Sequence, residues 1–150
     1  MPNLDNEVPR QARQARQAGI TATLLGTDAW GTIPTEDRMD LEGAYYSTQY
    51  AADSQNPRTD AFIRLYKQTY QRDPDDVAAT TYDTMRLLFR SIQTQGRADP
   101  ESIREGLSTI GRFEGVTGMI QYHGTGDPAR SLVVLRLQQG QPIFHRQDDP

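Results

Sequence analysis

The first fifty residues combine one polar, helix-forming stretch with two short apolar stretches. Three Arg-Gln-Ala triplets fill most of residues 7–18, and Gly19 follows them as a helix stop. The apolar run over residues 20–26 is typical of a buried strand, and the aromatic and β-branched residues of 43–48 predict a second strand. The order of helix, glycine turn and strand indicates an α/β fold.

The middle of the chain has helical periodicity. Asn56-Pro57 is a typical helix start, and apolar side chains recur at helical spacing over residues 57–71. A wide apolar stripe predicts a second helix over 76–95, and a third is predicted from Pro100 to its stop at Gly111. Three successive helices without a strand between them are unusual in a simple alternating fold.

The end of the chain returns to strand patterns. Strands are predicted over 118–122, 131–137 and 142–144, and turn-forming residues separate them. Turn formers also interrupt the pattern at 51–57, which makes this segment the best candidate for an internal crossing or linker. We therefore expect a mixed α/β structure with more helix than strand.

Composition narrows the class of protein. Of the 150 residues, 35% are hydrophobic and 24% are charged, which is typical of a folded globular chain. No apolar run approaches the roughly 20 residues that cross a bilayer. The net charge of −4 argues against binding to nucleic acid or anionic membranes. The absence of cysteine excludes disulfides, thiolate metal sites and cysteine nucleophiles.

Motifs of catalysis are lacking. His123 and His145 do not have the spacing of metal ligands, and the chain contains neither a G-x-S-x-G elbow nor a glycine-rich phosphate loop after a strand. The acidic group of Asp73, Asp75 and Asp76 is better explained by helix capping than by paired-carboxylate catalysis. We expect no enzymatic activity, no cofactor and no metal site.

Seven short motifs, in order along the chain, resemble those of type I periplasmic binding proteins for branched-chain amino acids, the Leu/Ile/Val-binding type. They are QARQAGI at 14–20, LGTDAW at 25–30, EGAYYSTQY at 42–50, FIRLY at 62–66, YDTMRLL at 82–88, FEGVTG at 113–118 and GDP at 126–128. Each motif alone is weak evidence, but the ordered set is specific. The chain resembles the C-terminal portion of such a protein, because complete family members are more than twice this length.

The resemblance implies a partial type I periplasmic-binding-protein-like α/β fold that contains C-terminal segments of both lobes. Residues 1–49 and 130–150 would belong to the second lobe, and residues 51–128 to the first. Tyr50 and the region of Ala129 would be hinge crossings between the lobes. Most of the first lobe's parallel sheet and the start of the second lobe would lie outside this chain.

Four residues are candidate ligand contacts. Asp28 follows a predicted strand, where open α/β sheets present binding groups, and the resemblance implies that its carboxylate pairs with a ligand's α-ammonium; taken alone, it reads as a turn cap. The resemblance makes Val77 an apolar wall for the ligand side chain, although its spacing fits ordinary helix core equally well. Trp30 is interpreted as a cover for the cleft mouth or as a packing anchor. Tyr50 is interpreted as a hinge or cleft residue.

The expected function is that of a solute-binding component of an ABC importer for branched-chain or related amino acids. Its partners would be the amino acid, a membrane permease, and either the missing first-lobe segment or a second copy of the chain. The alternative is a truncated remnant or self-associating module without transport activity. Because the turns that bind the ligand carboxylate would lie in the missing part, we expect the chain alone to bind leucine weakly or not at all.

The expected location depends on a leader sequence. Residues 1–19 lack the apolar core and cleavage site of a secretory signal peptide. A periplasmic or extracytoplasmic location is therefore expected if the full-length protein carries a signal peptide elsewhere, and a cytoplasmic one otherwise.

Overall fold

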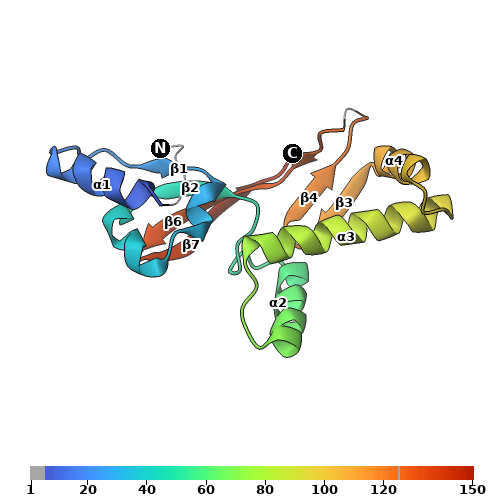
Figure 1. Ribbon diagram of the computed structural model, residues 1–150, viewed down its shortest axis with the longest axis horizontal. Coiled ribbons are helices and arrows are strands. Elements are labelled where there is room, and N and C mark those ends of the chain that lie inside the picture. The colour runs from blue at the N-terminus through green and yellow to red at the C-terminus, as the bar shows by residue number, and fades with distance from the viewer. Residues whose placement is uncertain (1–5, 125) are drawn as a thin grey trace.

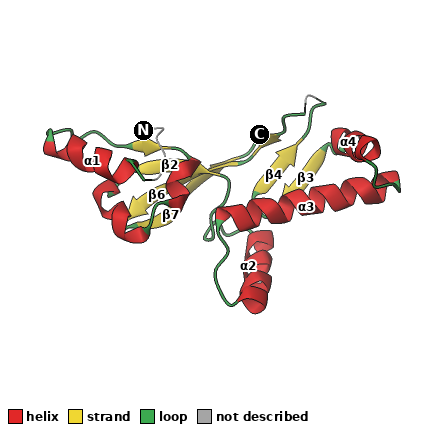
Figure 2. Cartoon of the chain, viewed as in Figure 1, coloured by secondary structure: helices red, strands yellow, loops and turns green. Residues whose placement is uncertain are grey.

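The computed structural model describes residues 6–124 and 126–150, which form two halves joined by a narrow waist (Figure 1). One half contains a four-stranded sheet and the other contains three long helices beside a three-stranded sheet (Figure 2). We call them the four-stranded half and the three-helix half. The buried apolar residues of the two halves form separate clusters, so each half has its own core.

The four-stranded half has the strand order β1-β2-β6-β7, in which β1 and β2 are parallel and the remaining neighbours are antiparallel. Its elements are α1 (Val8–Gln17), β1 (Leu25–Gly26), the 3₁₀ helices η1 (Asp28–Thr32) and η2 (Thr35–Leu41), β2 (Tyr45–Thr48), β6 (Leu132–Gln138) and β7 (Gln141–Asp148). Helix α1 ends as predicted, because Gly19 adopts a φ of 78°. The backbone N–H of Gly19 bonds to Arg16, and that of Ile20 bonds to Ala15.

The three-helix half has the antiparallel strand order β3-β4-β5. Its elements are α2 (Pro57–Tyr70), α3 (Asp76–Gln95), α4 (Pro100–Thr109), β3 (Arg112–Gly115), β4 (Gly118–Gln121) and β5 (Ala129–Arg130). The three predicted helix starts are confirmed, since the side chains of Asn56, Asp75 and Asp99 each accept a backbone N–H of the first helical turn.

The predicted buried strand over 20–26 is the main error of the sequence-based assignment. Only Leu25–Gly26 forms a strand, and the side chain of Leu25 is 63% exposed. Strand β1 lies at the edge of its sheet, where β2 is its strand partner among the described residues. The opposite error occurs at the other edge, where β7 is longer than the predicted 142–144.

A buried carboxylate joins α3 to the turn between β3 and β4. Asp83 is 1% exposed and accepts hydrogen bonds from the backbone N–H of Val116 (3.0 Å), the backbone N–H of Thr117 (2.9 Å) and the Thr117 hydroxyl (2.7 Å). The approach is so close that a β-carbon on Gly115 would lie 2.2 Å from Asp83 Oδ2. Asp83 therefore fixes the long helix against the three-stranded sheet.

The chain passes between the halves near Tyr50 and again at Ser131. Tyr50 belongs to the core of the three-helix half, whereas Ala51 packs in the other core. Ser131 is fully buried between β5 and β6, where its hydroxyl accepts the backbone N–H of Met119 and donates to Asp149 Oδ1. The end of β7 is thereby tied to the second crossing.

The contact between Asp149 and Ser131 predicts a pH dependence of stability. The hydroxyl of Ser131 stabilises the charged form and lowers the pKa of Asp149 below its ordinary value of 3.8. A lowered folded pKa contributes stability that is present above the unfolded pKa and is lost as the pH falls through the folded one. We expect Asp149→Asn to lower the free energy of unfolding at about pH 7 but not at about pH 2.

Urea unfolding at both pH values measures this difference. Glu105→Gln, an exposed change on α4, is the matched control and is expected to show no difference at either pH. An equal effect of Asp149→Asn at the two pH values would contradict the assignment.

Candidate functional site

A pocket of about 270 Å³ lies at the junction of the two halves. It is lined by Asp28, Thr48, Gln49, Asp76, Val77, Thr80 and Thr81. The first three come from η1 and the end of β2, and the others come from the first two turns of α3. Figure 1 shows the start of α3 beside the waist, where the chain leaves the four-stranded half. This is the candidate functional site because both halves contribute side chains to it.

Asp28 is held in the pocket by a tightly packed turn. Strand β1 ends at Gly26, Thr27 is extended, and η1 begins at Asp28, whose Oδ1 accepts the backbone N–H of Ala29 at 3.1 Å. Beneath this turn lies Trp30, so close to Gly26 that a β-carbon there would fall 2.1 Å from the indole ring. The side chain of Asp28 itself is exposed and available to a ligand.

Val77 and Asp76 stand at the first turn of α3. The helix begins after Asp75, whose Oδ1 accepts the backbone N–H of Ala78 at 2.7 Å. Asp76 Oδ1 accepts the backbone N–H of Val77 at 2.9 Å. The side chain of Val77 is 63% exposed, which rules out the ordinary helix-core interpretation and leaves it as a wall of the pocket.

The structure does not bring Trp30 and Tyr50 into this pocket. Trp30 is 1% exposed and packs near the ring of Tyr46, with 6.3 Å between ring centroids, so it is a packing anchor and does not cover a cleft mouth. Tyr50 is 7% exposed and lines a neighbouring cavity of about 480 Å³ on the same junction. Burial raises the pKa of Tyr50 to about 12, so its hydroxyl stays protonated at neutral pH.

Five lining residues were missed by the sequence reasoning. Thr48 ends β2 and Gln49 follows it, in a segment whose role was interpreted only as structural. Asp76 was interpreted as a helix cap, and its Oδ1 does accept a backbone N–H of the first turn. Thr80 and Thr81 follow Asp76 and Val77 at a spacing of four residues, which puts each pair on one helix face. This spacing was the signal in the sequence that could have identified Thr80 and Thr81 as neighbours of Asp76 and Val77.

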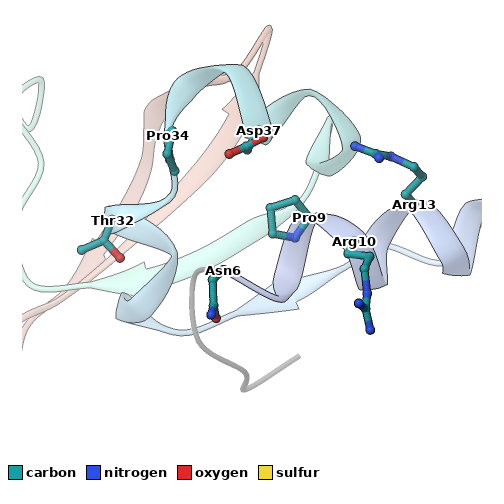
Figure 3. A pocket seen from close by; sticks show the side chains of 7 residues that line it. All are labelled: Asn6, Pro9, Arg10, Arg13, Thr32, Pro34 and Asp37. Atoms are coloured by element: carbon teal, nitrogen blue, oxygen red, sulfur yellow. The ribbon is translucent and has the colours of Figure 1, made fainter.

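Other features of the described chain are weaker candidates. A larger pocket of about 520 Å³ lies between α1 and the segment that leads into η2, away from the junction (Figure 3). One of its arginines, Arg13, is already engaged, since its guanidinium donates two hydrogen bonds to Asp40. Within residues 6–124 and 126–150, no three His, Asp or Glu side chains gather as metal ligands would. None of the helices there is long and apolar enough to cross a membrane.

Comparisons with known proteins agree on one family. The periplasmic binding protein family matches residues 3–142. The leucine-, isoleucine-, valine-, threonine- and alanine-binding protein of Pseudomonas aeruginosa is 31% identical over 117 residues, which are 77% of this chain and 31% of that protein. The crystal structure of a leucine-binding protein from Thermotoga maritima matches 99% of this chain with a TM-score of 0.85 and 28% identity.

A further solved structure shares the fold. The branched-chain amino acid transporter substrate-binding protein of Streptococcus pneumoniae, in complex with isoleucine, has a TM-score of 0.80 and 21% identity over 99% of this chain. This chain covers 43% of the Streptococcus structure and 43% of the Thermotoga structure. It therefore spans less than half the length of these solved relatives and about a third of the Pseudomonas protein.

Proposed function

Because this chain belongs to the periplasmic binding protein family, we propose that it is the C-terminal portion of the solute-binding component of an ABC importer, and that it holds an amino acid between two lobes. In this proposal, residues 1–49 and 130–150 belong to the second lobe and residues 51–128 to the first. The separate cores of the two halves support the division away from the crossing itself, where Tyr50 packs in the core of the three-helix half and Ala51 in that of the four-stranded half. The complete protein would act outside the cytoplasm and present its closed form to a membrane permease.

The observation that carries the proposal is the shared pocket. Asp28 and Val77 lie 49 positions apart in the sequence, on different halves, and line the same 270 Å³ space. A carboxylate is the natural partner of an α-ammonium, because a charge-assisted hydrogen bond in a partly desolvated cleft is strong. A ligand that contacts both halves stabilises the closed arrangement, which is how a binding protein signals occupancy.

The exposed apolar surface of this chain supports the need for a further segment. Leu25 on β1 is exposed, and so are Met85 and Phe89 on α3. The remainder of the family fold, supplied as the missing first-lobe segment, would cover such surface. A second copy of the chain is the alternative occupant, in which case the chain is a self-associating module without transport activity. Gel filtration separates the two, because only the alternative expects a dimer of the chain alone.

The test of the proposed function is to complete the fold and measure binding. The part of the Thermotoga maritima protein that this chain does not match is joined to this chain, and the hybrid is titrated calorimetrically with a panel of amino acids. We expect the hybrid to bind at least one of them, whereas the chain alone binds weakly or not at all, because it holds only part of the pocket. Asp28→Asn in the hybrid is expected to weaken binding about 10- to 100-fold, through loss of a charge-assisted bond.

Asp60→Asn is the matched control, since Asp60 is an exposed acidic residue on α2 that does not line the pocket. It is expected to leave the affinity unchanged. Failure of the folded hybrid to bind any amino acid would overturn the proposed function. If the Asp28→Asn hybrid binds amino acids as tightly as the unmodified hybrid, Asp28 does not bind the ligand.

A further inference from the structure

We propose that the amino acid bound in this pocket carries a second positive charge on its side chain, and that Asp76 is the residue that selects it. The ligand class is thus a diamino acid or a guanidino amino acid, not an aliphatic one. The inference rests on the proposed function and deepens it, because it concerns the same pocket. Its three supports are the charge of the pocket, the polarity of its wall and the direction of the Asp76 carboxylate.

Of the residues of this chain that line the pocket, two are carboxylates and none is basic. Arg38 lines the neighbouring cavity together with Asp76, and its guanidinium donates to the backbone carbonyl of Gly31. Asp28 belongs to the four-stranded half and Asp76 to the three-helix half, so the two charges face the space between the halves. In the part of the chain that the structure describes, neither carboxylate forms an ion pair, and none of the residues lining the pocket is Lys, Arg or His. One α-ammonium can neutralise one of them, so a second carboxylate is left for a second cation.

The part of the pocket wall that this chain supplies places hydrogen-bonding groups beside its apolar surface. Four neutral lining residues carry hydroxyl or amide groups: Thr48, Gln49, Thr80 and Thr81. Val77 is the single apolar residue among those that line it. A leucine side chain placed here would desolvate polar groups without offering them a hydrogen bond. An ammonium or guanidinium group would instead donate to the same oxygens, and the methylene stem would lie along Val77.

Asp76 is directed toward the turn that carries Asp28. A β-carbon on Gly31 would lie 3.4 Å from Asp76 Oδ2, which places this oxygen against η1 of the other half. The other oxygen, Oδ1, accepts the backbone N–H of Val77. The backbone N–H of Ala78 likewise donates to Asp75 Oδ1. These two N–H groups at the start of α3 are therefore already bonded and are not available to bind an anionic ligand group.

Closure of the lobes makes the second cation more effective. Bringing Asp28 and Asp76 together across the cleft opposes closure, because like charges repel more strongly as water is excluded. A ligand with one cation for each carboxylate removes that repulsion and links the two lobes. A positively charged ligand side chain therefore stabilises the closed state more than a neutral one does.

The test compares isosteric ligands on the same hybrid of this chain and the remaining Thermotoga maritima segment. L-ornithine and L-norleucine have side chains of equal length and differ in the terminal charge; L-lysine, whose side chain is one atom longer, L-arginine and L-leucine extend the panel. We expect L-ornithine and L-lysine each to bind at least about tenfold more tightly than L-norleucine, because the added contact is a charge-assisted one. Asp76→Asn is expected to abolish this ratio, whereas Asp60→Asn on α2 is expected to preserve it. The tighter binding of L-lysine should also weaken with added salt.

Each outcome decides a different claim. Equal or tighter binding of L-norleucine or L-leucine by the unmodified hybrid overturns the inference and leaves the proposed function standing. If the Asp76→Asn hybrid keeps the same affinity ratio between the cationic ligand and L-norleucine, Asp76 is not the selecting residue. A folded hybrid that binds no amino acid overturns the proposed function and the inference with it. As a second measurement, the intact Thermotoga protein is prepared with aspartate and with asparagine at the aligned position. The aspartate form should have the higher affinity for L-lysine relative to L-leucine; equal ratios for the two forms overturn the inference independently of the hybrid.

Discussion

Asp83→Ala is expected to lower the free energy of unfolding by about 3–4 kcal/mol. Three hydrogen bonds converge on this buried carboxylate, and a bond to a charged acceptor is worth about 1.5–3 kcal/mol, with incomplete additivity. Alanine would leave the backbone N–H groups of Val116 and Thr117 buried without an acceptor. Since a domain has about 5–15 kcal/mol of net stability, this single change should shift the unfolding midpoint markedly.

Urea unfolding followed by circular dichroism measures this loss. Asp83→Asn should cost less than Asp83→Ala, because one amide oxygen remains as an acceptor of nearly the same shape. Glu105→Ala, which removes an exposed carboxylate on α4, is the matched control and should stay within about 0.5 kcal/mol of the unmodified chain. Unfolding midpoints that coincide for Asp83→Ala and Glu105→Ala would show that Asp83 does not join α3 to the β3–β4 turn.

Gly26→Ala is expected to lower the free energy of unfolding by about 2–3 kcal/mol, through overpacking against a rigid ring. A β-carbon at this position would overlap the indole of Trp30, with an approach of 2.1 Å. Trp30 is 1% exposed and packs in the core of the four-stranded half, and close-packed cores resist the displacement of a large ring. The turn that carries Asp28 lies between the two residues, so it must shift as well.

Trp30 is the sole tryptophan of the chain, so its fluorescence reports the change directly during urea unfolding. Gly111→Ala is the matched control, because a β-carbon at Gly111 meets no atom within 4 Å and its backbone is not in the left-handed region. It should change the stability by less than about 1 kcal/mol. In the hybrid with the Thermotoga segment, Gly26→Ala should also weaken amino-acid binding, whereas Gly111→Ala should not. Equal stability and equal affinity of the two variants would contradict the packing role of Gly26.

The site illustrates what a motif can and cannot predict. Asp28 and Val77 were placed in the ligand pocket by resemblance, and the structure brings them together on one 270 Å³ space. For Trp30 the sequence left open a cover for the cleft mouth or a packing anchor, and the structure places this residue in the core. Asp76 was read as a cap from its place before a helix, and nothing in its local sequence shows that one of its oxygens also faces the turn carrying Asp28.

The sequence alone determined the helices of this protein and the family to which it belongs. Helix ends depend on hydrogen bonds between residues a few positions apart, such as those of Asn56, Asp99 and Gly19, so local residue types predict them. Strand lengths, burial and the pocket depended on tertiary structure. A strand is stabilised by neighbours distant in sequence, and within residues 20–26 the pairing with β2 begins only at Leu25. Only the approach of two halves across the waist decided that Asp28 and Asp76 share one space.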